Sequence, residues 1–116
     1  MTKPLENWKG DPDPDFDLEI AEGYIGKYLL VGITRLSHEG DMLSQLQLHG
    51  EIVAATADGI DIELRGVHEG HIWRMPPFLD DLNPAKPGFY ELRSTGESVE
   101  NPDFTFSMTI TKPPQQ

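Results

Sequence analysis

The chain contains no cysteine among its 116 residues. The absence of thiols excludes disulfide bonds, thiolate catalysis and Cys-ligated zinc or iron–sulfur sites. Basic residues are also few, because 9 Lys and Arg stand against 20 Asp and Glu, for a net charge of −11. A protein that binds phosphate backbones needs clustered Lys and Arg, so the charge argues against a nucleic-acid partner.

Long apolar runs are missing as well. No stretch approaches the ~18 consecutive apolar residues of a membrane span, and no basic start followed by an apolar core marks a signal peptide. We therefore expect a soluble cytoplasmic protein with no membrane partner. A single domain is expected, because a chain of this length can bury about two-thirds of the surface that its unfolded form exposes.

Helical periodicity is absent, whereas period-two alternation runs through most of the chain. Apolar residues at spacings of three and four are always interrupted by Gly or Pro, so no long helix is expected. Alternation and turn signals such as Asp58-Gly59 predict five or six main strands. These strands fall at residues 28–36, 42–55, 60–64, 72–75, 90–92 and 104–110, with a further short edge strand at 16–20.

The segment from Met42 to Ala55 has no break apart from Gly50. Fourteen extended residues would span about 46 Å at ~3.3 Å each, which exceeds the breadth of a domain with a radius of gyration of about 13 Å. We predict that this strand bends at Gly50 and is shared between two sheets. The expected fold is therefore all-β, a small closed or partly open barrel of five to six antiparallel strands, SH3-like or Sm-like.

Acidic residues are concentrated in the N-terminal part of the chain. Residues 1–26 carry seven acids and two bases, and residues 11–15 read Asp-Pro-Asp-Pro-Asp. Prolines remove backbone donors and the aspartates repel one another. We expect a flexible acidic lead at 1–15, in which Trp8 has most to gain by docking, a single barrel domain at 16–112 and a disordered tail at 113–116.

Three stretches resemble a small bacterial domain family of unknown function with an SH3-like or Sm-like barrel. They are residues 26–34 (GKYLLVGIT), 48–53 (LHGEIV) and 87–97 (PGFYELRSTGE). The resemblance covers roughly residues 24–112, implies one compact domain that occurs on its own, and brings no catalytic motif. Sm-like barrels bind RNA, but this chain has no basic loop, so RNA binding is not carried over.

Histidines offer one candidate site. In an up-and-down meander the first and third hairpins share an end, so His38 is expected near His68, Glu69 and His71. Neutral imidazoles and carboxylates suit Zn²⁺, Ni²⁺ or Fe²⁺. A metal or small-ligand site on this rim is one alternative function, and a small hydrolase working through the same rim is another. The simpler interpretation is that these are solvated turn residues.

The second candidate site follows the fourth main strand, where apolar residues are denser than a loop requires. Trp and Met are enriched in the cores of protein interfaces, so this segment is a candidate contact surface, or else it plugs one end of the barrel. The candidate partner-binding residues are Trp73, Met75, Phe78, Leu79, Asp80 and Asp81.

The acidic balance decides the predicted function. The sequence shows no nucleophile elbow and no glycine-rich phosphate loop, so neither an enzyme nor a cofactor is expected. A small, strongly acidic domain is suited to steering toward a basic surface, although such charge also serves solubility. We predict a non-enzymatic protein–protein interaction module, inhibitor-like or immunity-like, of the bacterial cytoplasm, as a monomer or a homodimer.

Overall fold

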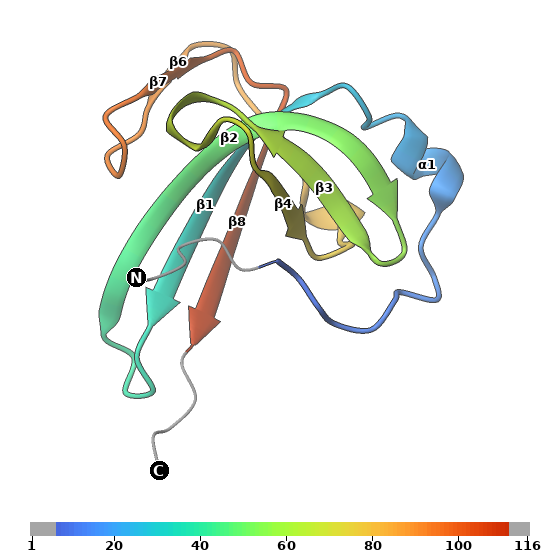
Figure 1. Ribbon diagram of the computed structural model, residues 1–116, viewed down its shortest axis with the longest axis horizontal. Helices are drawn as coiled ribbons and strands as arrows, with labels where there is room; N and C mark the ends of the chain where they lie inside the picture. The colour runs from blue at the N-terminus through green and yellow to red at the C-terminus, as the bar shows by residue number, and fades with distance from the viewer. Residues whose placement is uncertain (1–6, 112–116) are drawn as a thin grey trace.

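The computed structural model describes residues 7–111, so the predicted tail at 113–116 and the start of the acidic lead lie outside the described residues. Within 7–111 the chain is mostly strand (Figure 1). The elements in order are α1 (Leu18–Glu22), β1 (Tyr28–Leu36), β2 (Met42–Thr56), β3 (Gly59–Leu64), β4 (Ile72–Met75), β5 (Asn83–Pro84), β6 (Phe89–Glu91), β7 (Ser98–Glu100) and β8 (Phe104–Thr111), with 3-10 turns at Gly66–His68 and Leu79–Asp81.

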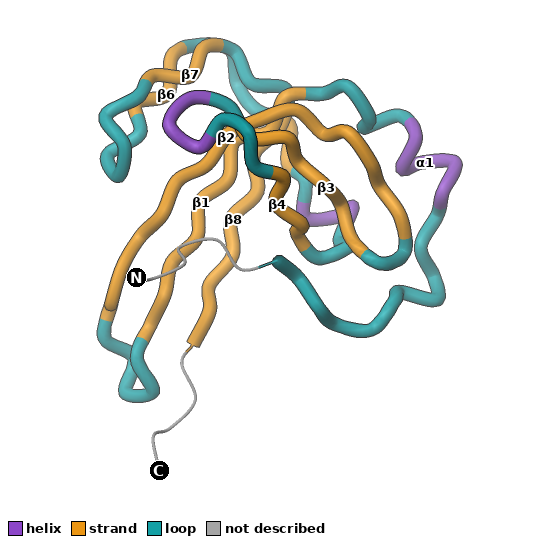
Figure 2. Tube along the Cα trace, in the orientation of Figure 1, coloured by secondary structure: helices purple, strands orange, loops and turns teal. Residues whose placement is uncertain are grey.

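Six of these strands form one sheet in the order β4-β3-β2-β1-β8-β5, and β6 pairs with β7 in a separate hairpin beyond one end of it (Figure 2). The prediction of an all-β fold without a long helix is confirmed. The prediction of a closed antiparallel barrel is wrong, because the sheet is open and β1 pairs with β8 in parallel. Alternation specifies which face of a strand is buried; it specifies neither strand direction nor whether the outer strands meet.

β2 is strongly curved and changes partners near its middle (Figure 1). The prediction that it is shared between two sheets is wrong, because β1, β2 and β3 belong to one sheet. It pairs with β1 as far as Glu51 and with β3 from Gly50 onward, so Gly50 faces Leu29 on one side and Leu64 on the other. A Cβ atom on Gly50 would overlap the carbonyl oxygen of Glu63. Glycine is therefore required here for the close approach of β3.

The core lies on the inner face of the curved sheet. On β3 the buried side chains alternate as the sequence predicts, and those of β1 alternate as well. Each contributes about 1.5–3 kcal/mol when fully buried. β4 adds Trp73 and Met75, which are 2% and 0% exposed. The strand residues of the core include Leu29, Val31, Ile33, Leu48, Ile52, Ile60, Ile62, Leu64 and Phe106.

The edge strand expected at residues 16–20 is instead the start of α1. Asp17 caps this helix, since its side-chain Oδ1 accepts hydrogen bonds from the backbone N–H groups of Glu19 (3.0 Å) and Ile20 (3.1 Å). Alternation over so few residues is a weak signal, and an N-cap aspartate stabilises a helix start by about 1 kcal/mol. The capping residue therefore decides the local structure.

The described part of the acidic lead lies against the body of the domain. The N–H of Trp8 donates to the carbonyl of Arg74 (2.8 Å), and the Arg74 N–H donates to Oδ1 of Asn7 (2.8 Å). Further along, the N–H of Asp13 donates to the carbonyl of Ala57 (3.0 Å). Trp8 is thus docked beside β4, as its apolar ring predicted, and residues 13–17 lie near the loop that follows β4.

Candidate functional site

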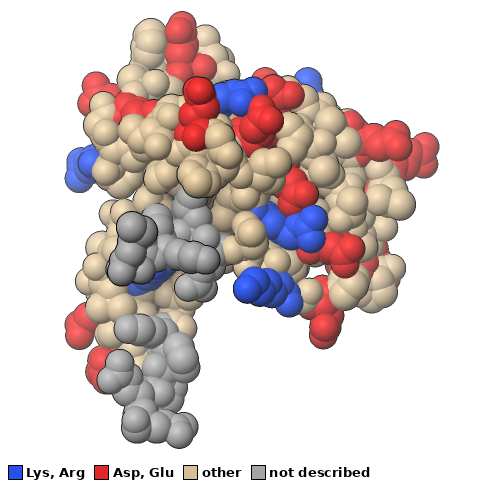
Figure 3. Space-filling view, in the orientation of Figure 1, with Lys and Arg blue, Asp and Glu red and all other residues tan. Residues whose placement is uncertain are grey.

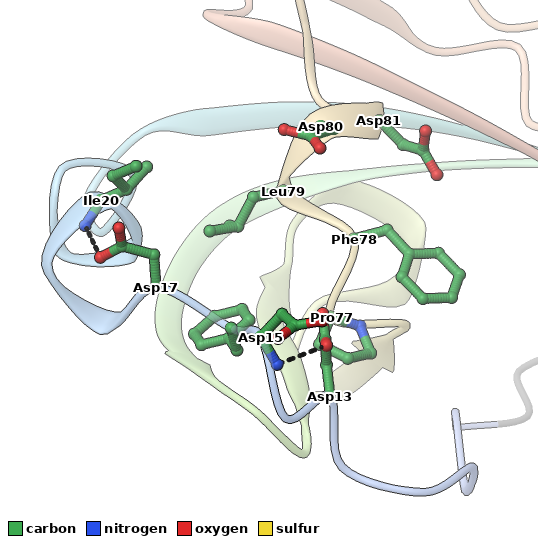
Figure 4. Close-up of a pocket in the computed structure, with 10 residues that line it drawn as sticks. Asp13, Asp15, Asp17, Ile20, Pro77, Phe78, Leu79, Asp80 and Asp81 are labelled. Atoms are coloured by element: carbon green, nitrogen blue, oxygen red, sulfur yellow. Dashed lines mark hydrogen bonds between the residues drawn. The ribbon is translucent and has the colours of Figure 1, made fainter.

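A hollow of about 350 Å³ lies between residues 13–20 and the loop at residues 77–81 (Figure 4). We call it the acidic groove. Five aspartates and five apolar or aromatic residues line it, so an apolar floor is bordered by carboxylates from two segments far apart in sequence. The lining residues are Asp13, Asp15, Phe16, Asp17, Ile20, Pro77, Phe78, Leu79, Asp80 and Asp81.

Local hydrogen bonds shape the first side of the acidic groove. Oδ1 of Asp13 accepts the N–H of Asp15 (2.9 Å), and the carbonyl of Asp13 accepts the N–H of Phe16 (3.2 Å). This turn and the Asp17 cap hold the three aspartates on a short, folded stretch. Ile20 remains 56% exposed beside them.

The opposite side of the acidic groove is the loop after β4. Pro76 and Pro77 end the strand because proline cannot donate to the ladder, and a 3-10 turn at Leu79–Asp81 follows. Leu79 points toward the α1 side, whereas Phe78 points the other way (Figure 4). Phe78 packs against Trp8 in an edge-to-face arrangement, with ring centroids 5.7 Å apart.

The six residues predicted to bind a partner separate into two groups. Trp73 and Met75 belong to the core, so a partner at the surface cannot reach them, and the packing alternative describes them. Phe78, Leu79, Asp80 and Asp81 line the acidic groove. The sequence analysis did not foresee that Asp13, Asp15 and Asp17 would face these residues, since no local pattern pairs the two segments.

The four residues proposed for a metal site do not come together. No group of three or more His, Asp or Glu residues within 7–111 is arranged to hold a metal ion. His38 lies in the β1–β2 turn, whereas His68, Glu69 and His71 lie in the β3–β4 connection. The ladder between β3 and β2 ends at the pair Leu64–Gly50. From Gly50, β2 continues for eight more residues to Met42, a distance of about 26 Å along the strand. The length of β2 therefore separates the two turns (Figure 1).

A buried polar network lies elsewhere and was missed by the sequence analysis. The hydroxyl of Tyr28 is 2.5 Å from Nδ1 of His49, and Nε2 of His49 is 3.3 Å from Oε2 of Glu97. The same Glu97 oxygen accepts the N–H of Val67 (3.0 Å). Gly66 has a φ of +72°, and a Cβ there would overlap the Glu97 carboxylate.

Alternation placed His49 on a solvent-facing side of its strand, but it is only 8% exposed. Leu48, His49 and Gly50 are buried in succession, because β2 is covered on both faces where it changes partners. Tyr28 and His49 also line a hollow of about 370 Å³ beside β7. Nδ1 of His49 faces the Tyr28 hydroxyl and Nε2 faces the Glu97 carboxylate, so the network joins the β6–β7 turn to the sheet.

Two pKa shifts follow from this arrangement. Burial opposes the ionisation of Glu97, but hydrogen bonds from Thr95, His49 and the Val67 amide outweigh it and lower the pKa of Glu97. Burial raises the pKa of Tyr28, against a lowering by Arg65 and with a further rise due to Glu97. Glu97 is therefore ionised and Tyr28 neutral near pH 7, which suits a phenol that donates to His49.

Comparisons with protein-family models, with characterised proteins and with solved structures gave no match. The resemblance to a small bacterial domain family accordingly stays a prediction. Among residues 7–111, none of the helices has the length and apolar character needed to cross a bilayer. The function is therefore argued from the geometry of the described residues.

Proposed function

We propose that this chain is a non-enzymatic protein-binding module whose acidic groove docks a basic segment of a partner protein. The observation that carries the proposal is that five aspartates, from two sides of the acidic groove, line it together with partly exposed apolar side chains (Figure 4). Such a surface fits a segment in which Lys or Arg side chains flank an apolar one. The net charge of −11 extends the same preference over the rest of the chain.

The apolar floor supplies the anchoring energy. Ile20 is 56% exposed and Leu79 points toward it, so a partner side chain that covers these two removes apolar surface from water (Figure 4). Phe78, 42% exposed on the other side of the loop, offers further apolar surface. Burial yields about 25 cal/mol per Å² of apolar area. An exposed ion pair adds only about 0.2–1 kcal/mol. The floor therefore sets the affinity, and the aspartates select a basic partner and speed its approach.

A peptide titration tests this proposal. The probe is a short fluorescent peptide in which lysines flank a leucine and a phenylalanine, with a glutamate-for-lysine peptide as its control. Fluorescence anisotropy should show binding of the lysine peptide only. The affinity should fall as NaCl rises from about 0.05 M to about 0.3 M, since the Debye length shortens from ~14 Å to ~6 Å.

A matched pair of variants locates the contact. Replacing Asp80→Asn and Asp81→Asn together should weaken peptide binding about fivefold or more. Replacing Glu39→Gln and Asp41→Asn changes the net charge equally in the exposed β1–β2 turn and should change the affinity less than about twofold. Equal effects of the two pairs, or none from the first pair, would refute docking in the acidic groove.

A further inference from the structure

A second hollow, of about 370 Å³, lies where β4 faces β1 and β8. We call it the seam cavity. In the sheet order, β3 and β2 separate β4 from β1 and β8, so only the curvature of the sheet brings these strands opposite one another. The residues that line the seam cavity are Asn7, Trp8, Lys9, Gly10, Ile33, Arg35, Trp73, Arg74, Pro76, Met108 and Ile110.

The seam cavity exists because the predicted barrel does not close. No backbone ladder joins β4 to β8 in the described chain, and residues 7–10 bridge the gap instead, tied to β4 by the Trp8 and Asn7 hydrogen bonds to Arg74. A bridge of one extended segment leaves room that a paired strand would fill. The cavity is therefore a consequence of the open sheet.

The interior of the seam cavity is apolar. Ile33 and Trp73 are almost fully buried at its base, with 4% and 2% of their surface exposed. On β8, Met108 is half-buried and Ile110 is 39% exposed. The volume of about 370 Å³ lies at the lower end of the range for small-molecule sites, about 300–1,000 Å³. A small ligand with an apolar body fits this space, whereas a folded partner does not.

The rim of the seam cavity is basic in an otherwise acidic protein. Of the nine Lys and Arg residues, Lys3 and Lys112 lie outside the described residues, and three of the other seven, namely Lys9, Arg35 and Arg74, line this cavity. Figure 3 shows Lys and Arg atoms near the middle of this face, with Asp and Glu atoms beside them. Asp61 fixes the Arg74 guanidinium through two hydrogen bonds (2.7 and 3.1 Å) and balances its charge, so the exposed Lys9 is the cation of the rim on which the binding of an anion would depend.

We propose that the seam cavity binds a small amphipathic anion, an apolar body that carries one carboxylate. The apolar body occupies the space over Ile33 and Trp73, and the carboxylate lies at the rim near Lys9 and the two arginines. A Lys ammonium forms charge-assisted hydrogen bonds with a carboxylate, so Lys9 is the expected partner of the ligand's carboxylate. This site shares no lining residue with the acidic groove, so the proposal stands independently of peptide binding.

The chain carries its own reporter for this test. It has two tryptophans, and both Trp8 and Trp73 line the seam cavity. Decanoate and 2-naphthoate are titrated separately, with decanol and 2-naphthalenemethanol as neutral controls of the same shape. We expect a saturable change in tryptophan fluorescence with at least one carboxylate, with its neutral analogue binding at least about fivefold more weakly. The two carboxylates distinguish an aliphatic ligand from an aromatic one.

A matched pair of charge reversals places the carboxylate. Lys9→Glu should weaken binding of the carboxylate about fivefold or more, whereas Lys27→Glu, at an exposed position before β1, should change it less than about twofold. Isothermal titration calorimetry on the same variants gives the affinity without relying on tryptophan emission.

Three outcomes would overturn the proposal. One is the absence of saturable binding up to about 1 mM of either carboxylate. Another is equal binding of acid and alcohol, or equal loss in the two lysine variants. The third is that a carboxylate binds only after residues 112–116 are deleted, which would mean that the chain itself occupies the cavity.

Discussion

Two stretches of chain, residues 7–20 and 73–81, contribute to both the acidic groove and the seam cavity, which β1 and β8 complete, yet the charged residues that line the two sites have opposite sign. Residues 7–10 and 73–76 contribute to the seam cavity, and residues 13–20 and 77–81 form the acidic groove. Trp8 lines the cavity, Phe78 lines the groove, and their rings are in contact. The two sites are therefore neighbours with a shared aromatic wall.

The comparison separates what makes a hollow from what selects its ligand. In both sites the hollow arises where the N-terminal segment crosses the end of β4 without pairing as a regular strand. Apolar side chains fill the floor of each site, and only the charged residues at the rim differ in sign. Because exposed charges contribute little affinity but discriminate strongly against like charge, the rims determine which ligand class each site accepts.

The largest expected effect comes from removing the shared wall with Trp8→Ala. A fully buried Trp→Ala substitution costs about 3–5 kcal/mol, and Trp8 is half-buried, so we expect a loss of about 2 kcal/mol in the free energy of unfolding. Both lysine-peptide and carboxylate binding should weaken. Urea unfolding and the two titrations measure these changes. Trp8→Phe, which keeps a ring against Phe78, should retain most of both, and loss of only one activity in Trp8→Ala would contradict a shared wall.

A smaller effect is expected at the Tyr28–His49–Glu97 network, which shares no residue with either hollow. Glu97→Gln should lower the free energy of unfolding at pH 7 by about 1 kcal/mol. Peptide and carboxylate affinities should stay within about twofold of wild type. Glu100→Gln, at an exposed position on β7, is the control and should have little effect on stability.

The pH dependence of the Glu97 effect has a defined sign. The pKa of Glu97 is lower in the folded state than its ordinary value of 4.5. Its contribution to stability is therefore present above that ordinary value and is lost as the pH falls through the folded pKa. Urea unfolding below about pH 5 should show a difference between wild type and Glu97→Gln that shrinks as the pH falls. A difference that grows below about pH 5 would refute the assignment.

The smallest effects are expected when each variant pair is tested against the other ligand. The pair Asp80→Asn and Asp81→Asn should leave carboxylate affinity within about twofold of wild type, and Lys9→Glu should do the same for the lysine peptide. The two titrations described above supply the measurement. If either change altered both affinities by the same factor, the protein would respond to net charge rather than to two distinct rims.

Much of the secondary structure could be predicted from the sequence. Alternating residues such as Ile60 and Ile62 identified buried faces, Asp58-Gly59 identified a hairpin, and the uninterrupted run around Gly50 identified a bent strand. These signals work because strand geometry and tight turns are local requirements. The parallel pairing of β1 with β8 could not be predicted, since it depends on the path of residues 85–103 rather than on the pattern within either strand.

The candidate site was predicted only in part. Apolar and acidic residues at 78–81 were identified from the sequence, but Asp13 and Asp15 were assigned to a flexible lead and Asp17 to a short edge strand. The alternating pattern of β2 would place His49 on the solvent-facing side, but the pattern ends at Leu48, His49 and Gly50, where both faces of the strand are covered. Each of these residues acquires its surroundings from a segment distant in the chain, which a local pattern does not encode.

The sequence by itself determined the acidic charge, the absence of thiol chemistry, the strand-rich fold and the glycine in the middle of the long strand β2, because composition and local backbone geometry are properties of neighbouring residues. The tertiary structure alone decided that the sheet stays open, that three cations gather at its seam and that two acidic segments face each other. Those features depend on where the curved sheet brings distant residues together, and that placement is set by the packing of the whole core.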